Sequence, residues 1–530
     1  MKRNRTLYWG FIVMLPLLIG FFGCKKFLDR KPLTATLDDL HQGAVEGESL
    51  GLYFNLRNLA GFSTLPWLDF HSIRDDDAEK GSSQTDGAEV NTEFDSYSYS
   101  KDDWAPNTYW NDHYTMIQLA NNELHDADSL KVTDEASLRN VGEAHFFRAY
   151  AYFDLVRTYG DVPILTKKIV LPSDAIKAKS PAADVYAQID ADLTVASQDL
   201  PPNWNNTAGK STFPGRLTRG AANTLWAQAY LYRQNWSRVV ALCNQVVGSG
   251  EYTLSARFSD IWKDGLNGAG KNGPESIFEM QATAGQGAAT NSALDQGQDY
   301  GTSQNVRQGG ATNVWNLGWG WNTPTQNLVD AWDNTDPRKN QTILFSGQYD
   351  GGSDQGGYGA TLPPYDMLEA AGGIARKYWN KKVYSDPAMR QFTGWINGTG
   401  AARWINHRIL RYADVILMLA EASNELGDGP TAETNLELIR ARASGGLPAA
   451  TRTIVPKITY TTQAAMRTAI KNERRFEFAM EGCRFYDLVR WGDALSVLGG
   501  LGYTNRARFY PIPQQALDIS GGVLKQNPEW

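Results

Sequence analysis

The sequence SLRNVGEAHFFRAYAYFDLVRTY, residues 137–159, decides the fold of this 530-residue chain. It contains no proline, so nothing in it blocks a continuous helix. Apolar residues occupy almost every face of its second half, and a helix that is apolar all round is buried between neighbours. The segment therefore predicts a mainly helical protein with this helix in its core.

Two further segments predict helical hairpins. Residues 219–248 form two amphipathic halves that are separated by Gln234 and Asn235, and residues 411–444 repeat the design around a turn at 427–430. Pro430 suits the first turn of a helix, where its missing N–H is not needed. Small residues and aromatics recur at comparable offsets in these segments, which resembles the tetratricopeptide repeat. We therefore predict a mainly α fold built on tetratricopeptide-like helical hairpins.

Two stretches differ from this helical pattern. Residues 61–110 and 263–404 are rich in Gly, Asn, Gln, Thr and Trp, with short strand-like runs such as SIFEMQ at 276–281. Long irregular segments of compact domains usually carry function. We predict one domain at 41–530, in which helices at about 41–60, 111–262 and 405–500 form a scaffold and the two stretches are ligand-binding insertions.

The N-terminus has the pattern of a secretory signal. Lys2, Arg3 and Arg5 precede an apolar run at 7–22, which is shorter than the roughly 20 residues that cross a bilayer, and Cys24 follows. The pattern resembles a bacterial lipoprotein signal, in which the cysteine is acylated. We predict a signal peptide at 1–23, lipidation at Cys24 and a lipid-anchored tether at 24–40. An ordinary cleaved signal, with an incidental cysteine, is the alternative.

The composition of the rest predicts a large body that folds in water. Hydrophobic residues make up 42% and charged residues 21%, without a second long apolar run. Removal of residues 1–23 takes away three positive charges and changes the formal net charge from −7 to −10. So acidic a protein is a poor partner for nucleic acid, whose phosphates must be neutralised. We expect Cys243 and Cys483 to be free buried thiols, although a bridge between them is compatible with the sequence.

The sequence lacks the common motifs of catalytic and metal sites. None of its six histidines begins a His-Glu-x-x-His pair, no cysteine pair has zinc spacing, and there is no Gly-x-Ser-x-Gly elbow. We therefore predict a non-catalytic protein without a cofactor. Calcium is a minor option, because DGGSDQ at 350–355 resembles a calcium loop without the glutamate at the twelfth position. RDDD at 74–77 offers paired carboxylates or calcium ligands, but we expect a solvated acidic loop.

Alternating charges near the C-terminus predict a partly buried ion network in the scaffold, since opposite charges on one helix can pair. Its members are Glu473, Arg474, Arg475, Glu477, Arg484, Asp487 and Arg490.

Tryptophans of the two insertions are the strongest signal of a binding site. Each indole can cover about 150–250 Å², so an indole outside the helices must pack into a core or bind a ligand. The chain has 17 tryptophans, and those that we place outside helices are Trp67, Trp104, Trp110, Trp315, Trp319, Trp321, Trp379, Trp395 and Trp404.

The run NVWNLGWGWN at 313–322 combines indoles with amides. The apolar face of a pyranose packs on an indole while its hydroxyls need polar partners. If the run is extended, Trp319 and Trp321 point to one face, and Gly318 and Gly320 let a ligand approach the backbone. For any single tryptophan, packing in the core of the insertion is the alternative. The ligand contacts that we predict are Trp315, Trp319, Trp321, Asn313, Arg307, Arg74 and Trp104.

Four long blocks resemble the SusD/RagB family. They are EAHFFRAYAYFDLVRTYGDVPI (143–164), RYADVILMLAEA (411–422), ERRFEFAMEGCRFYDLVRWG (473–492) and YPIPQQALDISGGVLKQNPEW (510–530), and CKKFLD (24–29) is similar to that family's mature start. The resemblance implies a non-catalytic lipoprotein of the outer membrane, facing the cell exterior. It implies that the protein binds oligosaccharides and delivers them to a SusC-like TonB-dependent transporter. The RagB branch binds peptides, so a subunit of a peptide importer is the alternative.

The lipid anchor gives the first testable prediction. Cys24→Ser should move the mature protein from the membrane fraction to the soluble fraction, because the acylated side chain is lost. Fractionation and immunoblotting measure this, and retention of the variant in the membrane fraction would contradict the assignment.

Overall fold

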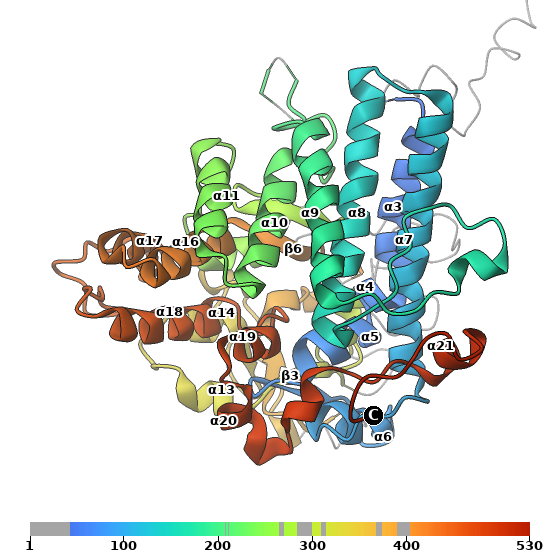
Figure 1. Cartoon of the computed structure of the whole chain (residues 1–530). Coiled ribbons are helices and arrows are strands. Elements are labelled where there is room, and N and C mark those ends of the chain that lie inside the picture. The colour runs from blue at the N-terminus through green and yellow to red at the C-terminus, as the bar shows by residue number, and fades with distance from the viewer. Residues whose placement is uncertain are drawn as a thin grey trace, which may run out of the picture.

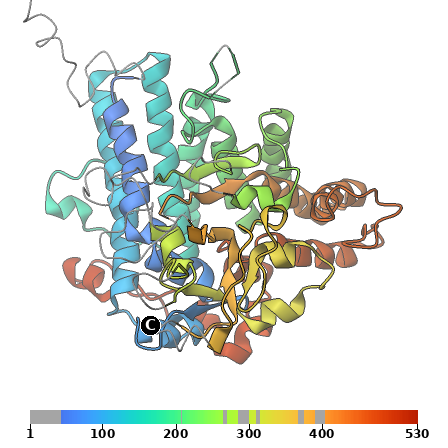
Figure 2. The ribbon, with the colours of Figure 1, turned by 180° about the vertical axis from the view of Figure 1, so that it is seen from behind.

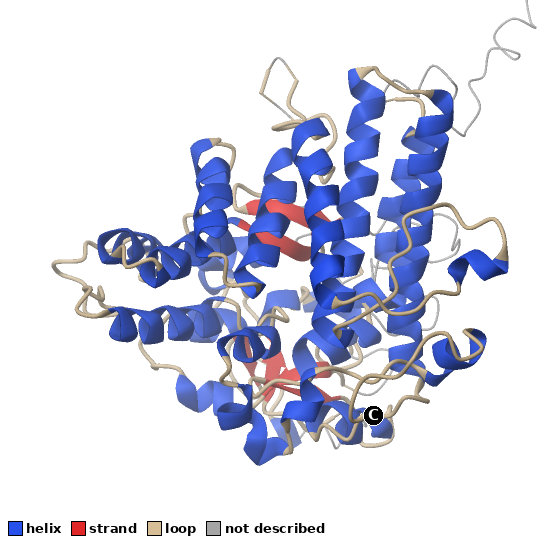
Figure 3. Ribbon diagram, in the orientation of Figure 1, coloured by secondary structure: helices blue, strands red, loops and turns tan. Residues whose placement is uncertain are grey.

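The computed structural model describes residues 43–206, 208–209, 211–263, 270–283, 299–308, 314–366, 374–388 and 403–530. Cys24 and the predicted signal and tether up to residue 40 lie outside these ranges. The described residues are mainly helical, with a few short strands (Figure 3). None of the described helices is both long and apolar enough to cross a membrane.

Long helices form the scaffold and stand side by side (Figure 1). α7 packs against α3 and α8, α8 against α9, α9 against α10, and α10 against α11; α16 then joins α11 to α17 and α18. The bounds are α3 Glu46–Asn58, α7 Trp104–Leu130, α8 Glu135–Tyr159, α9 Ala182–Asp199, α10 Arg219–Tyr232, α11 Trp236–Gly248, α16 Tyr412–Glu425, α17 Gly429–Ala443, α18 Gln463–Glu477 and α19 Arg484–Trp491.

The predicted helical segments are confirmed. In the central helix α8, Asp134 caps the N-terminus by accepting a hydrogen bond from the Ser137 N–H, and Gly160 at φ +75° follows the last turn. The hairpin of α10 and α11 turns at residues 233–235, where Gln234 has φ +55° and the Asn235 side chain caps α11. The hairpin of α16 and α17 turns just before Gly429, with Asp428 as the cap. The two turns occur where the sequence placed them.

Short elements fill the insertions and the C-terminal part. The helices are α4 Ala60–Ser63, α5 Leu65–Leu68, α6 Ala88–Val90, α12 Asp299–Gln304, α13 Gln326–Ala331, α14 Arg338–Thr342, α20 Ala494–Leu498 and α21 Gln514–Ile519, and the strands are β1 Ala78–Gly81, β2 Ser276–Met280, β3 Trp321–Pro324, β4 Ile343–Phe345, β5 Tyr378–Asn380 and β6 His407–Arg411. The strands form three antiparallel pairs, β1 with β3, β2 with β6 and β4 with β5. The yellow and orange segments of the second insertion gather on the face seen in Figure 2.

The predicted ion network is confirmed, but its residues pair mainly with other elements rather than along one helix. Its centre is Glu477, whose carboxylate is fully buried. It accepts hydrogen bonds from Arg411 of β6 (2.6 Å), Arg442 of α17 (2.5 Å) and Arg338 of α14 (3.1 Å). Burial alone would raise the pKa of Glu477, but the three guanidinium groups outweigh it and hold that pKa well below its usual value.

The Arg-Asp-Asp-Asp segment joins the same region, which corrects the expectation of a solvated acidic loop. Asp76 and Asp77 are buried. Arg475 lies within 3.1 Å of the Asp76 carboxylate and 2.5 Å of the Asp77 carboxylate, and Arg484 donates to Asp76 at 2.8 Å. Arg475 of α18 and Arg484 of α19 thus pair with these carboxylates. The ion pairs attach the segment that precedes β1 to the two C-terminal helices.

The two cysteines of the described residues do not pair. Cys243 lies buried in α11, and Cys483 is half-buried before α19; both are free thiols.

Removal of the central carboxylate should destabilise the fold strongly. Glu477→Ala removes the carboxylate that three buried guanidinium groups share, although each keeps another carboxylate partner. Breaking a buried ion pair typically costs about 3–5 kcal/mol. Urea unfolding followed by circular dichroism measures the loss. The matched control is Glu135→Ala, which removes the exposed partner of Arg139 on α8. Equal losses in the two variants would contradict the role of Glu477.

Candidate ligand-binding site

The pairing of β1 with β3 brings the two insertions together. Gly81 lies opposite Trp321 in the register, so the loop that follows β1 lies beside the run that precedes β3. A Cβ atom on Gly81, which has φ +71°, would lie 2.3 Å from the Gly320 carbonyl oxygen. Only glycine allows this approach. The close contact places the loop at 82–90 next to Gly320 and Trp321.

A small polar cluster fixes the loop at 82–90. The Arg307 guanidinium pairs with the Asp86 carboxylate and donates to the Ser82 hydroxyl at 3.1 Å, and that hydroxyl donates to Asp86 at 2.8 Å. Partial burial raises the pKa of Asp86, but the hydrogen bonds from Arg307 and Ser82 outweigh it and lower that pKa to about 2. Asp86 is therefore a carboxylate, and a hydrogen-bond acceptor, at neutral pH.

Two indoles flank this loop. Trp319 is half-buried, and the Arg307 guanidinium lies 5.2 Å from its ring centroid. Trp104, the first residue of α7, is 44% exposed, and its Nε1–H donates to Glu89 of α6 at 3.3 Å. We call Trp104, Trp319, Arg307, Asp86 and Glu89 the 82–90 loop site. It combines apolar rings with charged hydrogen-bonding groups around one loop.

Such a surface suits a ligand with apolar faces and hydroxyl edges. Aromatic rings contribute contact area at a low entropic cost, and a few fixed polar groups set the orientation. The arrangement offers both carboxylate acceptors and a guanidinium donor. It favours a neutral polyhydroxylated ligand over an anion or a cation.

The other predicted contacts fall elsewhere. Trp315, like Trp319, is half-buried and packs against the hydrophobic core, but none of the contacts described above joins it to the loop. Trp321 is only 6% exposed; the Lys80 ammonium lies 4.9 Å from its ring, and a Cβ on Gly87 would touch it at 2.8 Å. Trp321 therefore supports the loop from below. Asn313 lies outside the described residues.

Trp319 and Trp321 do not share one face, as an extended run would require. Gly320 has φ +71°, and this left-handed residue interrupts the alternation of side chains. The space beside Gly318 and Gly320 is filled by other parts of the protein and not by a ligand. A Cβ on Gly318 would lie 2.1 Å from the Thr302 carbonyl oxygen, and one on Gly320 would lie 3.1 Å from the Trp379 ring.

Arg74 was predicted as a polar contact, and the structure contradicts this. Its side chain is fully buried, with the guanidinium 3.8 Å from the centroid of the Phe485 ring. Its Nε donates to the Phe70 carbonyl at 2.7 Å. A side chain enclosed in this way packs the core beneath the site and is not available to a ligand.

Most of the other insertion tryptophans are also core residues. Trp67 lies in α5 and Trp110 in α7, so two indoles that we placed outside helices are buried by helices after all. Trp379 and Trp404 are fully buried in the core. Trp395 lies outside the described residues.

The 350–355 loop is organised by its own hydrogen bonds. The Asp350 carboxylate accepts from the backbone N–H groups of Gly352, Tyr358 and Gly359, and Asp354 pairs with Arg257. Within the described parts of the chain, no three His, Cys, Asp or Glu side chains converge in a way that suits a metal ion.

Comparison with known proteins identifies the family. A family model described as "SusD family" matches residues 274–507, and a second, described as "Starch-binding associating with outer membrane", matches residues 68–231. The chain belongs to the SusD family. The two matches include most of both insertions and most of the scaffold helices.

Relatives and solved structures agree with membership of the SusD family. SusD-like protein P2 of Formosa agariphila is 25% identical over 86% of each chain, and SusD-like protein P38 of the same organism is 24% identical over 99% of each. A laminarin binding SusD-like protein of known structure is 26% identical, with a TM-score of 0.70 over 92% of this chain and 100% of that one. Surface glycan-binding protein A from Bacteroides thetaiotaomicron, in complex with laminarihexaose, shares the fold at 21% identity, with a TM-score of 0.72 over 91% of this chain and 98% of that one.

The sequence interpretation of this SusD-family chain missed Ser82, Asp86 and Glu89. The segment GSSQTDG at 81–87 carried a signal, because Ser, Asp and Gly together are typical of a turn that hydrogen-bonds its own backbone. Only the β1–β3 pairing, which is not visible in the sequence, shows that this turn lies beside Trp319.

Glu93, in the π-helical turn after α6, gives a pH-dependent prediction. Burial and the nearby Asp103 carboxylate raise the pKa of Glu93 to about 8, and the Tyr510 hydroxyl donates to it. The folded state therefore binds this proton more tightly than the unfolded state. The stability that the proton contributes is complete below the ordinary glutamate pKa and is lost as the pH rises through about 8.

The free energy of unfolding should therefore fall between pH 5 and pH 8.5, and Glu93→Gln should make the fall smaller because its amide stays neutral. Urea titrations at several pH values measure both slopes. Identical slopes in the wild type and the variant would contradict the assignment.

Proposed function

We propose that this chain is a cell-surface binding protein that captures neutral oligosaccharides at the 82–90 loop site. It delivers them to a SusC-like TonB-dependent transporter in the outer membrane without changing any covalent bond. Membership of the SusD family supports the proposal, as does the 26% identical structure that is named as laminarin binding. The match to a family described as starch-binding and outer-membrane-associated agrees with both the ligand class and the location.

The observation that carries the proposal is that two partly exposed indoles from different segments, Trp104 of α7 and Trp319 before β3, are linked by polar contacts to the same loop. Trp104 contacts the loop through Glu89 and Trp319 contacts it through Arg307 and Asp86. Sugar rings can therefore lie against either indole while their hydroxyls reach the carboxylates. Because Arg307 already holds Asp86, the loop is ordered before a ligand arrives, which lowers the entropic cost of binding.

The same contacts support a role in binding rather than catalysis. Glycoside hydrolysis needs one carboxylic acid that is protonated near neutral pH beside a second carboxylate. Asp86 has a lowered pKa and is held by Arg307, so it does not supply that proton. Glu93 and Asp95 have pKa values that burial raises to about 8 and about 7. However, Glu93 is buried and accepts a hydrogen bond from Tyr510, and Asp95 accepts one from the Lys80 backbone N–H.

The proposal includes attachment to the membrane by a lipid on Cys24, with the tether at 24–40 leading to the helical body. A lipid anchor keeps the protein beside an outer-membrane partner and raises the effective concentration of each for the other.

The test is isothermal titration calorimetry of the mature chain with a panel of neutral hexasaccharides and hexapeptides. Trp319→Ala and Trp104→Ala should each weaken saccharide binding by about 1–2 kcal/mol, because each removes an aromatic contact. The matched control is Trp236→Ala, since Trp236 also begins a helix but lies on α11, away from the loop. Unchanged affinity in both site variants would contradict the site, and binding of peptides alone would select a peptide importer.

A further inference from the structure

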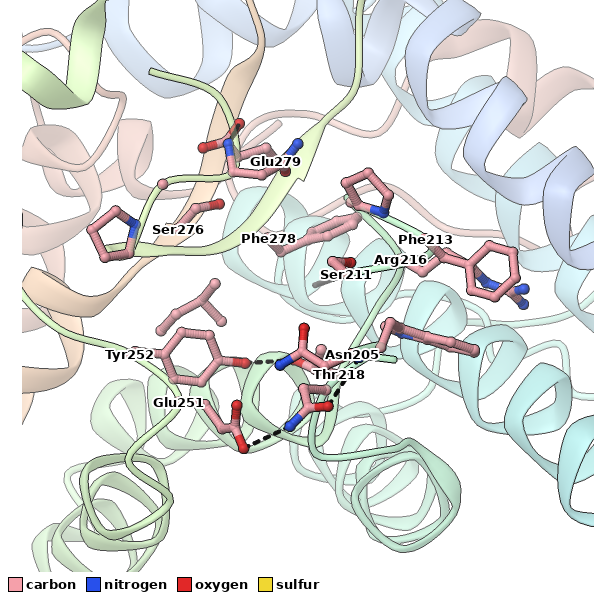
Figure 4. A pocket seen from close by; sticks show the side chains of 18 of the residues that line it. Asn205, Ser211, Phe213, Arg216, Thr218, Glu251, Tyr252, Ser276, Phe278 and Glu279 are labelled. Carbon is pink, nitrogen blue, oxygen red and sulfur yellow. Dashed lines mark hydrogen bonds between the residues drawn. The ribbon is translucent and has the colours of Figure 1, made fainter. Parts of the chain in front are cut away.

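A separate cavity of about 310 Å³ lies between the loop at 202–218, the segment at 251–252 and β2 (Figure 4). None of the residues of the 82–90 loop site lines it. In Figure 1 the partner strand of β2, β6, lies well above α6, so the cavity and the loop site are in different parts of the molecule. Its volume is at the lower end of the range of small-molecule sites, about 300–1,000 Å³.

Four aromatic side chains line this cavity, namely Trp204, Phe213, Tyr252 and the buried Phe278 of β2, and the fold holds them in place. The Trp204 Nε1–H donates to the Leu217 carbonyl at 2.8 Å, and Phe213 meets the Trp204 ring edge to face at 5.5 Å. The Tyr252 hydroxyl bonds the Thr218 hydroxyl at 2.6 Å. The aromatic wall is therefore ordered without a ligand.

Two charged groups of the wall, Arg216 and Glu279, are already paired with opposite charges, and the third, Glu251, is exposed at the rim. Arg216, which lies 4.5 Å from the Trp204 ring, donates two hydrogen bonds to Glu143 and one to Glu46. Glu279 accepts from the Asn406 side chain at 2.8 Å and lies 3.6 Å from Arg408. Paired charges of this kind offer little attraction to an ionic ligand, so the cavity favours a neutral one.

The rim carries polar groups with unused hydrogen-bonding capacity. The Asn203 amide donates to the exposed Glu251 carboxylate at 2.8 Å, which leaves the second carboxylate oxygen facing solvent. Among the hydrogen bonds of the described residues, none uses the side chain of Asn205 or Ser211, both of which are exposed and line the cavity. Amide, hydroxyl and carboxylate groups beside aromatic rings match the alternating polar and apolar surfaces of a sugar.

A second cavity, of about 450 Å³, lies next to the first. Pro202 and Tyr252 line both, so the Tyr252 ring stands between them. The second cavity adds the amides of Asn223, Asn244 and Gln245. We call the two cavities together the Tyr252 groove. Its shape suits a short chain whose units lie on either side of one aromatic ring.

We infer that the Tyr252 groove is a second carbohydrate site, which binds a short neutral saccharide independently of the 82–90 loop site. Trp204, Phe213 and Tyr252 provide the apolar surface, and Asn205, Ser211 and Glu251 provide the hydrogen bonds. The choice of a sugar as ligand rests on the proposed function; the existence of a neutral, amphipathic site rests on the groove alone.

The test uses the mature chain with both loop-site indoles removed, Trp104→Ala with Trp319→Ala, as the background. The probes are maltose, cellobiose and laminaribiose, titrated by isothermal calorimetry. The background protein should bind at least one of them. Adding Ser211→Trp, which fills the mouth of the cavity, should weaken that binding at least tenfold. Adding Asn205→Ala should weaken it severalfold without steric change, in case the larger substitution disturbs the loop.

Ala208→Trp is the matched control, because Ala208 is exposed in the same loop but does not line the cavity. The control should leave the affinity unchanged. Absence of disaccharide binding by the background protein, or binding that neither Ser211→Trp nor Asn205→Ala affects, would overturn the inference. The proposed function would fail on a different result. The wild type would then bind hexasaccharides, and the loss of Trp104 and Trp319 would not change the affinity.

Discussion

The structure depends on the convergence of three arginines on the buried carboxylate of Glu477. Arg338, Arg411 and Arg442 come from α14, β6 and α17, so one side chain of α18 fixes three elements that are remote in the sequence. Burying charged groups is costly, and the cost is offset only when each group is paired. The elements therefore dock together or not at all. These ion pairs favour one arrangement of the second insertion on the helical scaffold. Apolar packing is not directional, so by itself it would favour no single arrangement as strongly.

The helix α18 also positions the candidate ligand-binding site. Arg475 lies two residues before Glu477 in α18, and it binds Asp76 and Asp77 just before β1. From there β1 pairs with β3, which places the loop at 82–90 beside Trp319. A rigid connection thus runs from the scaffold to a shallow surface with half-exposed indoles. A binding protein benefits from such a surface, because a ligand does not have to order it.

The helical scaffold could be predicted from the sequence because its signals are local. Apolar periodicity and the turns at Gln234 and Asp428 fix the hairpins without knowledge of the rest of the chain. The site was predicted only in part, since the exposure of an indole depends on distant neighbours. Trp319 and Trp321 stand two residues apart in a uniform-looking run, but the left-handed Gly320 separates a half-exposed ring from a buried one. Arg74 resembled a solvent-facing group in sequence, and Phe485, more than 400 positions later, encloses it.

Hydrogen–deuterium exchange of the mature chain, with and without a neutral hexasaccharide that it binds, locates the ligand on the protein. If a pre-ordered loop captures the sugar by contact alone, the ligand slows exchange in peptides covering residues 82–90, the start of α7 and residues 314–321, while α16 and α18 exchange at unchanged rates. Unchanged exchange in the three site segments, or protection spread through the scaffold helices instead, would contradict capture at this loop.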